Sequence, residues 1–119
     1  MKNQYNKRQV GSRYEKLTGA YLQSKGYRIL EFNYRCRFGE IDIVAMHGEC
    51  LVFCEVKYRK DASYQDPLEA IGADKQRVIS RCAMYYLMKH DMEDMVCRFD
   101  VVGIVGDKVQ VIQDAFYLD

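Results

Sequence analysis

The 119-residue sequence lacks the features that build membrane spans, secretion signals and zinc sites. Its longest apolar runs, such as residues 101–105, are far shorter than the roughly 20 residues that cross a bilayer. No basic segment precedes an apolar one near the N-terminus, so we expect no secretory signal. The five cysteines form no Cys-x-x-Cys pair, which argues against zinc and favours reduced thiols in a cytoplasmic protein.

The composition is that of one globular domain, expected to span residues 1–119. Hydrophobic residues make up 49% and charged residues 29%, without repeats, linkers or low-complexity tracts. The net charge of +1 conceals an asymmetry: residues 1–60 carry 12 Lys/Arg against 6 Asp/Glu, and residues 61–119 carry 6 against 11. A basic half can attract nucleic acid, but on charge alone a solvated surface is the preferred interpretation.

The spacing of apolar residues predicts the element order α-β-β-β-α-β-β. Helical spacing runs from Gln9 to Lys25, and Gly26 stands where a helix-ending glycine belongs. Asp66-Pro67-Leu68-Glu69 carries N-cap signals for a second helix that extends to about Lys89, with a break near Gly72 left open. Strands are expected at residues 27–33, 40–46, 50–58, 97–105 and 109–113. This order indicates an α/β fold with a mixed five-stranded sheet flanked by helices.

The hairpin between residues 39 and 58 carries the most informative pattern. If Gly48-Glu49 is its two-residue turn, the numbers of facing residues sum to 97. Charged residues then gather at one end of one face, with Asp42 opposite Glu55 and Glu40 opposite Lys57. The other face carries Ile41, Ile43, Ala45, Val52, Cys54 and Val56. Apart from the charged end, both faces are apolar, which predicts burial on both sides.

The facing carboxylates favour a divalent cation. Facing Cβ atoms lie about 4.5–5.5 Å apart, and two carboxylates that close repel unless a cation compensates them. One lysine offsets only part of that charge, whereas a hard cation bound by carboxylate oxygens would offset more. The alternative is a structural salt bridge at a sheet edge, such as Glu40–Lys57. Glu15 on the first helix is either a further member of the site or the N3 residue of a capping box that begins at Ser12.

These residues resemble the PD-(D/E)xK nuclease superfamily, in which an acidic residue on one strand precedes Glu-x-Lys on the next. The sequence is most similar to its YraN-like branch, which resembles archaeal Holliday-junction resolvases. The phrases that carry this resemblance are Gly39–Asp42, Leu51–Arg59, Glu69–Ile71, Lys75–Arg77, Arg98–Val102, Tyr21-Leu22 and Gly26–Leu30. The chain departs from the pattern at three positions. Ile41 stands where the superfamily has proline, Tyr14 where the family usually has glycine, and Cys54 where Val or Ile is usual.

The resemblance implies a restriction-endonuclease-like fold and metal-dependent phosphodiester hydrolysis. Asp42, Glu55 and the Val56 carbonyl would hold Mg²⁺ or Mn²⁺, with Glu15 or Glu40 completing or extending the set. Lys57 would orient the attacking water or stabilise the transition state. Resolvases of this type act as homodimers, because two strands must be cut symmetrically.

Several basic residues flank this candidate site. Phosphate contacts are expected from Arg35, Arg37, Arg59, Lys60, Lys75 and Arg77, although a solvated surface explains them as well. Asp100 is expected to form a structural salt bridge with Arg98 rather than to bind metal. The first hypothesis is therefore a metal-dependent endonuclease acting on DNA, and the second is a nucleic-acid-binding module without turnover.

Overall fold

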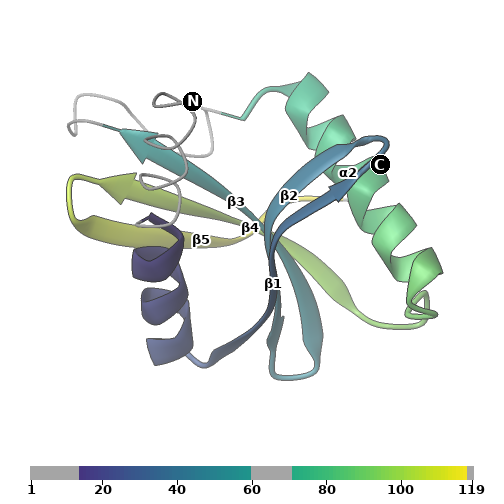
Figure 1. Ribbon diagram of the computed structural model, residues 1–119, viewed down its shortest axis with the longest axis horizontal. Helices are drawn as coiled ribbons and strands as arrows, with labels where there is room; N and C mark the ends of the chain where they lie inside the picture. Colours follow the sequence, from purple (N-terminus) through teal and green to yellow (C-terminus); the bar gives the residue numbers. More distant parts are fainter. Residues whose placement is uncertain (1–13, 60–70, 118–119) are drawn as a thin grey trace, which may run out of the picture.

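The computed structural model describes residues 14–59 and 71–117 (Figure 1). The N-terminal helix is described over residues 14–24. The other elements are β1 (Tyr27–Cys36), β2 (Gly39–His47), β3 (Cys50–Arg59), α2 (Ala73–Lys89), β4 (Cys97–Val105) and β5 (Lys108–Phe116). The predicted order α-β-β-β-α-β-β is confirmed. The expectation of one domain over the whole chain stays a prediction.

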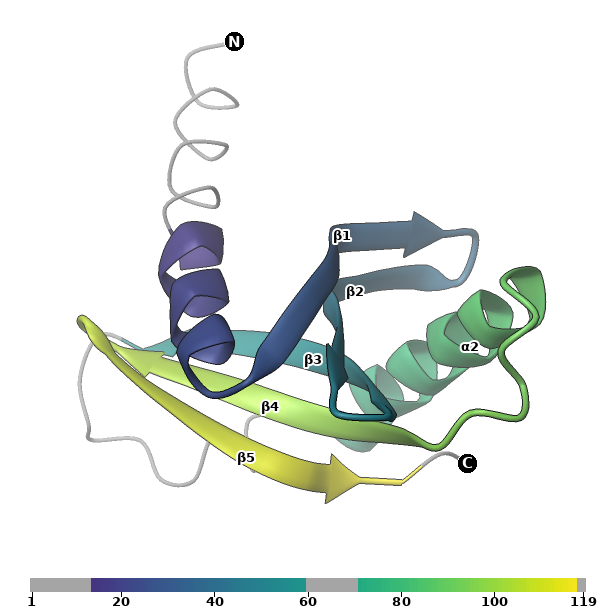
Figure 2. The ribbon, with the colours of Figure 1, turned by 90° about the horizontal axis from the view of Figure 1, so that it is seen from below.

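One five-stranded sheet has the order β1-β2-β3-β4-β5. All neighbours are antiparallel except β3 and β4, which are parallel and are joined through α2. The mixed sheet expected from the sequence is therefore confirmed. Figure 2 shows that the hairpin of β1 and β2 bends away from the plane of β3, β4 and β5.

The two helices cover opposite faces of the sheet, and each face has its own core. On the α2 side, Phe53 and Phe99 pack against the buried face of the helix, which includes Ile79 and Tyr86. On the other side, Leu22 of the N-terminal helix packs on a smaller cluster from the sheet, made of Tyr27, Ile43, Ala45, Val52, Cys54 and Val102. The central strands are therefore buried on both faces, as their apolar runs predicted.

Strands β1 and β5 each extend three residues beyond their predicted ends. β1 continues to Cys36 rather than ending at Asn33, because residues 34–36 pair with residues 39–41 of β2 and bury Tyr34 against α2. β5 likewise runs to Phe116. Gly72 is the extended N-cap at which α2 begins, and whether a helix precedes it lies outside the described residues. The capping signals at residues 66–69 lie outside the described residues.

No helix in the described parts of the chain is long and apolar enough to cross a membrane.

Candidate functional site

The candidate site lies where β2 parts from β3. The two strands pair from His47 and Cys50 to Ile43 and Cys54, in the register predicted from the Gly48-Glu49 turn. Pairing then stops, so the predicted regular pairs of Asp42 with Glu55 and of Glu40 with Lys57 are wrong. Asp42 instead accepts a hydrogen bond of 2.8 Å from the backbone N–H of Val56 through its Oδ2. A side-chain carboxylate thus occupies a position that a β2 carbonyl would fill in a continued ladder.

The strand also changes face at this point. Ile43 belongs to the core cluster beside the N-terminal helix, whereas Ile41 belongs to the cluster beneath α2. The prediction that both isoleucines share a face is therefore wrong, because strict alternation holds only along a regular strand. Asp42 lies between them at the bend, where its carboxylate can reach β3.

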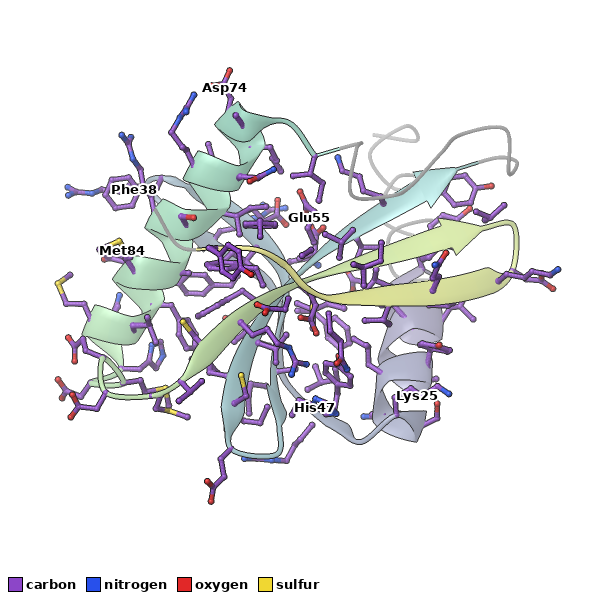
Figure 3. All side chains as sticks on the ribbon, turned by 180° about the vertical axis from the view of Figure 1, so that it is seen from behind. Lys25, Phe38, His47, Glu55, Asp74 and Met84 are labelled. Carbon is purple, nitrogen blue, oxygen red and sulfur yellow. The ribbon has the colours of Figure 1, made fainter. Side chains whose placement is uncertain are left out.

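Glu55 is a buried carboxylate directed to the α2 side of the sheet (Figure 3). Its residue is only 4% exposed. Burial, a hydrogen bond with Asp42 and the negative charge of Asp42 raise the pKa of Glu55 to about 8, against the opposing positive charges of Lys75 and Lys57. One of the two neighbouring carboxylates therefore holds a proton near neutral pH, as expected for like charges brought together in a buried place.

One oxygen of Glu55 has incomplete polar contacts. Its Oε2 lies 3.4 Å from Nζ of Lys75, which is an ion pair, yet no group among residues 14–59 and 71–117 has the geometry of a hydrogen bond to this buried atom. The side chain of Lys75 is 44% exposed, so solvent screens part of its attraction to Glu55. A buried carboxylate oxygen without a hydrogen-bond donor is uncommon in folded proteins.

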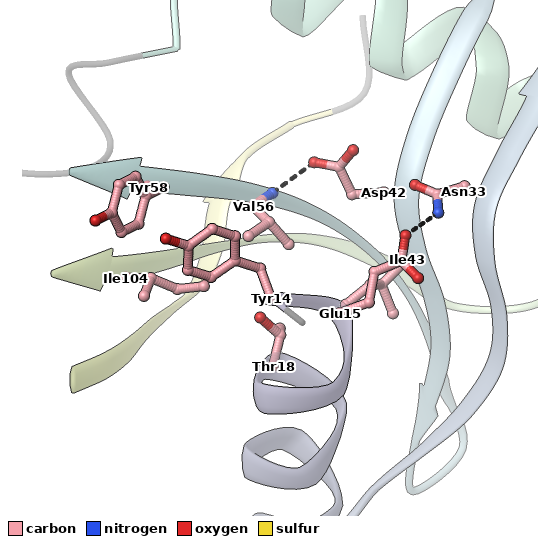
Figure 4. A pocket seen from close by; sticks show the side chains of 9 residues that line it. All are labelled: Tyr14, Glu15, Thr18, Asn33, Asp42, Ile43, Val56, Tyr58 and Ile104. Atoms are coloured by element: carbon pink, nitrogen blue, oxygen red, sulfur yellow. Dashed lines mark hydrogen bonds between the residues drawn. The ribbon is translucent and has the colours of Figure 1, made fainter. Parts of the chain in front are cut away.

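Glu15 reaches the same region from the N-terminal helix (Figure 4). It lines a cavity of about 220 Å³ together with Asp42, and Asn33 of β1 donates a hydrogen bond to its carboxylate. Asn33 has a positive φ of 54°, a conformation that asparagine tolerates better than most residues. Ser12 lies outside the described residues, so the capping-box alternative stays a prediction.

The donor set suits a divalent cation in part. Asp42 and Glu55 supply neighbouring carboxylates, and burial together with Asp42 raises the pKa of Glu55. Within residues 14–59 and 71–117, however, no three His, Cys, Asp or Glu side chains lie close enough together to hold a metal ion. Glu15 would have to leave Asn33 to complete such a set.

Sequence comparisons identify the relatives of this chain. The sequence profile described as "Uncharacterised protein family UPF0102" matches residues 14–104. The chain belongs to the UPF0102 family. The resemblance to the YraN-like family is thereby confirmed, and the matched segment includes Glu15, Asp42 and Glu55 but not β5.

Curated UPF0102 proteins cover most of the chain. One from Syntrophus aciditrophicus is 47% identical over 108 residues, covering 87% of this chain and 85% of its own. One from Marinobacter nauticus is 41% identical over 117 residues, covering 94% and 95%. One from Lachnoclostridium phytofermentans is 46% identical over 112 residues, covering 93% and 95%.

The basic residues singled out in this UPF0102 chain have different surroundings. Lys75 lies at the site through its contact with Glu55. Arg35 pairs with Glu40 at 3.6 Å, so the predicted Glu40–Lys57 alternative is replaced by a different ion pair. Arg77 pairs with Asp74 on the exposed side of α2. Arg37 is exposed in the β1–β2 turn, whereas Lys60 and the side chain of Arg59 lie outside the described residues.

Sequence reasoning missed three residues that shape the cavity of the UPF0102 chain: Thr18, Asn33 and Tyr58. The sequence predicts Asn33 as the last residue of a strand. An asparagine inside a strand-like run was the available signal, since asparagine is depleted in strands and tolerates positive φ. Thr18 and Tyr58 carried no signal, because their meeting depends on how the N-terminal helix crosses β3.

A second buried carboxylate lies on the neighbouring strand of the UPF0102 chain. Asp100 of β4 is fully buried and accepts a hydrogen bond of 2.8 Å from Nε of Arg98. The predicted salt bridge between these residues is confirmed. Figure 3 labels His47, whose Nδ1 lies 3.0 Å from the same guanidinium.

Proposed function

We propose that this UPF0102 protein is a metal-dependent endonuclease that hydrolyses phosphodiester bonds in DNA, including branched or junction DNA. The observation that supports the proposal is the paired Asp42 and Glu55 at the parting of β2 and β3. Their shared negative charge is only partly compensated, as the raised pKa of Glu55 indicates. Mg²⁺ or Mn²⁺ would compensate it through carboxylate oxygens.

Each residue of the site has a role in this proposal. When bound, the cation would supply a water of lowered pKa and offset charge on the scissile phosphate. Asp42 and Glu55 hold the cation, with the Val56 carbonyl as a further oxygen ligand. Glu15 extends the set. Lys57, whose charge acts on Glu55, orients the water or stabilises charge in the transition state.

Glu40 is a weaker candidate for a metal ligand than Glu15. It is ion-paired with Arg35, which is largely exposed, so its charge is already compensated outside the cavity. Glu15 lines the cavity together with Asp42 and is held there by a neutral amide. We therefore assign Glu15 to the metal set and leave Glu40 at its edge.

The proposal includes nucleic-acid contacts beyond the metal. Arg37, Arg59, Lys60 and Lys75 would contact phosphates, since such contacts give affinity without reading sequence. Symmetric cleavage of a junction would require a homodimer. The proposed setting is the cytoplasm, where reduced thiols persist, and all five cysteines are free in the structure.

A second candidate is a nucleic-acid-binding module that keeps the fold without turnover. One observation favours it: Glu15, Asp42 and Glu55 do not form a three-ligand group in the described structure. Asn33 donates a hydrogen bond to Glu15, and while this bond persists only Asp42 and Glu55 would be left to bind a metal. In this case DNA binds without cation-dependent cleavage.

Calorimetric titration with Mn²⁺ tests the proposal on wild type, Asp42→Ala and Asp107→Asn. Asp107 is exposed in the β4–β5 turn, so its variant controls for the loss of one negative charge far from the cavity. We expect binding in wild type and in the control and at least a tenfold loss in Asp42→Ala. A screen of flapped, branched and linear DNA with Mg²⁺ or Mn²⁺ then measures cleavage.

The outcomes separate the two candidates. Metal binding that depends on Asp42, together with cleavage, supports the endonuclease. DNA binding by wild type without Mn²⁺ binding, even when DNA is present, overturns the catalytic proposal and leaves the binding module.

A further inference from the structure

The cavity beside Asp42 contains more than metal ligands. Its polar side is formed by Glu15, Asn33 and Asp42, and Thr18 lies at its floor on the N-terminal helix (Figure 4). Its remaining walls are apolar or aromatic and comprise Tyr14, Ile43, Val56, Tyr58 and Ile104. A mostly apolar pocket with a few converging polar groups is the usual form of a site for a small organic group.

Within the described part of the chain, the hydroxyl of Thr18 has no hydrogen-bond partner, and the residue is fully buried. A helical threonine often bonds to the carbonyl four residues earlier, which here is Tyr14, but Thr18 does not. Figure 4 shows its side chain directed from the helix toward the Tyr14 ring, on the cavity side. An unsatisfied hydroxyl at the floor of a cavity offers both a donor and an acceptor to a bound group.

Two tyrosine rings form one wall of the cavity. The ring centroids of Tyr14 and Tyr58 lie 4.7 Å apart with a tilt of 36°, and Tyr58 is 41% exposed. The pair joins the N-terminal helix to β3, two residues beyond Val56, whose N–H donates to Asp42. Aromatic rings in such a position present a flat surface on which another planar group can stack.

The size of the cavity limits what can bind. Its volume of about 220 Å³ equals that of about seven liquid waters, which is room for one flat heterocycle and too little for a base pair. A planar ring with polar edges would match both the aromatic wall and the Thr18 hydroxyl. The cavity adjoins Asp42, so a base bound in it would lie next to a carboxylate that the proposed function places at the scissile phosphate.

We propose that this cavity binds one unpaired nucleobase, that of the nucleotide next to the scissile phosphate. The base stacks on the Tyr14–Tyr58 pair, and its polar edge bonds to Thr18. This inference rests on the proposed function, and it narrows the substrate to DNA with an unpaired nucleotide at the cut. Unstacking costs least for a base that is already unpaired, which gives the site a preference for bulged or branched DNA.

Fluorescence anisotropy tests the proposal with two short DNA duplexes in metal-free buffer, so that no cleavage occurs. One carries a single unpaired 2-aminopurine, and the other has an abasic site at that position. We expect wild type to bind the first about tenfold more tightly, as one stacked base provides. Stacking on tyrosine should also quench 2-aminopurine fluorescence.

Three variants locate the effect. Thr18→Val keeps the side-chain shape and should reduce the preference about threefold without loss of stability, because no hydrogen bond is removed. Tyr58→Ala should bring the preference close to one and restore fluorescence. Tyr85→Ala, on α2 outside the cavity, is the control and should keep the full preference. Thermal melting confirms that each variant is folded.

The results distinguish this inference from the proposed function. Equal binding of the two duplexes by wild type, or an unchanged preference in both cavity variants, overturns the base site, whatever the Mn²⁺ titration shows. A preference lost in Thr18→Val and Tyr58→Ala supports it. If that pattern appears without Mn²⁺ binding or cleavage, the base site stands and the endonuclease falls.

Discussion

Two buried carboxylates on adjacent strands are treated in opposite ways by this fold. Asp100 of β4 is fully buried, and four hydrogen bonds reach its two oxygens. Two come from Arg98 at 2.8 and 2.9 Å, one from the Tyr27 hydroxyl at 2.7 Å and one from the Asp114 N–H at 3.0 Å. A carboxylate with a cation and donors on both oxygens can be buried in its charged form.

Glu55 of β3, in contrast, lacks a hydrogen-bond donor at its Oε2 among the described residues. Among the described residues, the cation within ion-pair distance is the partly exposed Lys75, at 3.4 Å, and the neighbouring Asp42 is another carboxylate. The two strands are paired in parallel, with Cys54 opposite Asp100, so both acids share one sheet. The fold evidently supplies a full set of donors where a charge serves structure. Where donors are missing, as at Glu55, we propose that a ligand supplies the missing contacts.

The network around Asp100 stabilises its own charges. The hydrogen bond to Asp100 raises the pKa of Arg98 despite partial burial, and burial followed by the bond to Asp100 raises the pKa of Tyr27. Both groups therefore keep their protons throughout the neutral range. Gln113 adds a hydrogen bond of 3.1 Å to the Tyr27 hydroxyl, which ties β5 to the start of β1.

Asp100→Ala should cause the largest loss of stability. It leaves Arg98, which is 17% exposed at its side chain, without its partner and removes the acceptor of Tyr27 and Asp114. Breaking a buried ion pair on one side costs about 3–5 kcal/mol. Urea unfolding at pH 7 measures this, with Asp107→Ala in the exposed turn as a control that should change little. A loss below about 1 kcal/mol would show that the network is not structural.

Glu55→Gln should have the opposite sign. The substitution removes a charge that burial and Asp42 disfavour, and its amide can donate to Asp42. We expect about 2 kcal/mol of stabilisation above pH 8, since each pKa unit corresponds to about 1.4 kcal/mol and relaxation reduces the full effect. The measurement is urea unfolding of both proteins at several pH values.

The difference in stability between wild type and Glu55→Gln should depend on pH. The pKa of Glu55 is raised from its ordinary 4.5 to about 8, so the native state binds more protons than the unfolded state between these values. Stability from the protonated carboxyl is fully present below pH 4.5 and is lost as pH rises to 8. The variant should therefore match wild type near pH 4.5 and exceed it above pH 8. Equal stability at both ends would contradict the uncompensated state of Glu55.

Tyr27→Phe should weaken the Asp100 network by a smaller amount. It removes a hydroxyl that donates to Asp100 and accepts from Arg98 at 3.0 Å and from Gln113, but it keeps the ring stacked on His47 at 4.2 Å. A loss of about 1–2 kcal/mol is expected for one hydrogen-bonding group in a buried network. Tyr117→Phe, on an exposed residue, provides the control. A neutral result for Tyr27→Phe would show that Arg98 alone satisfies Asp100.

The salt bridge between Arg98 and Asp100 and the pairing of β2 with β3 were predictable from the sequence, whereas the surroundings of Glu55 were not. The alternation of apolar residues and the glycine at position 48 were enough to predict the pairing of β2 with β3 up to Ile43. Arg98 and Asp100 are two residues apart on one strand, so their salt bridge is a local event. Local patterns of this kind are what a sequence displays directly.

The surroundings of Glu55 depend on contacts between distant elements. The bend at Asp42 arises because its side chain replaces a backbone acceptor, and spacing rules assume that the ladder continues. The sequence places Lys57 opposite Glu40 and predicts only partial compensation from it, whereas Lys75 of α2 forms the ion pair with Glu55. Nothing in the sequence reports how that helix is laid across the strands, and the same applies to Asn33 and Glu15.

Lys75→Gln should produce the smallest change in stability and still test how Glu55 is compensated. The lysine is 44% exposed at its side chain, so solvent screens most of its attraction, and a loss below about 0.5 kcal/mol is expected at pH 9. Its charge opposes the rise in the pKa of Glu55, so the variant should raise that pKa further. Carbon NMR titration of the Glu55 carboxyl measures it, with Arg77→Gln on the outer side of α2 as the matched control. If the pKa of Glu55 fell or stayed unchanged, Lys75 would not be its compensating cation. Glu55 would then have no described cation within ion-pair distance that compensates its charge, whereas Asp100 has Arg98.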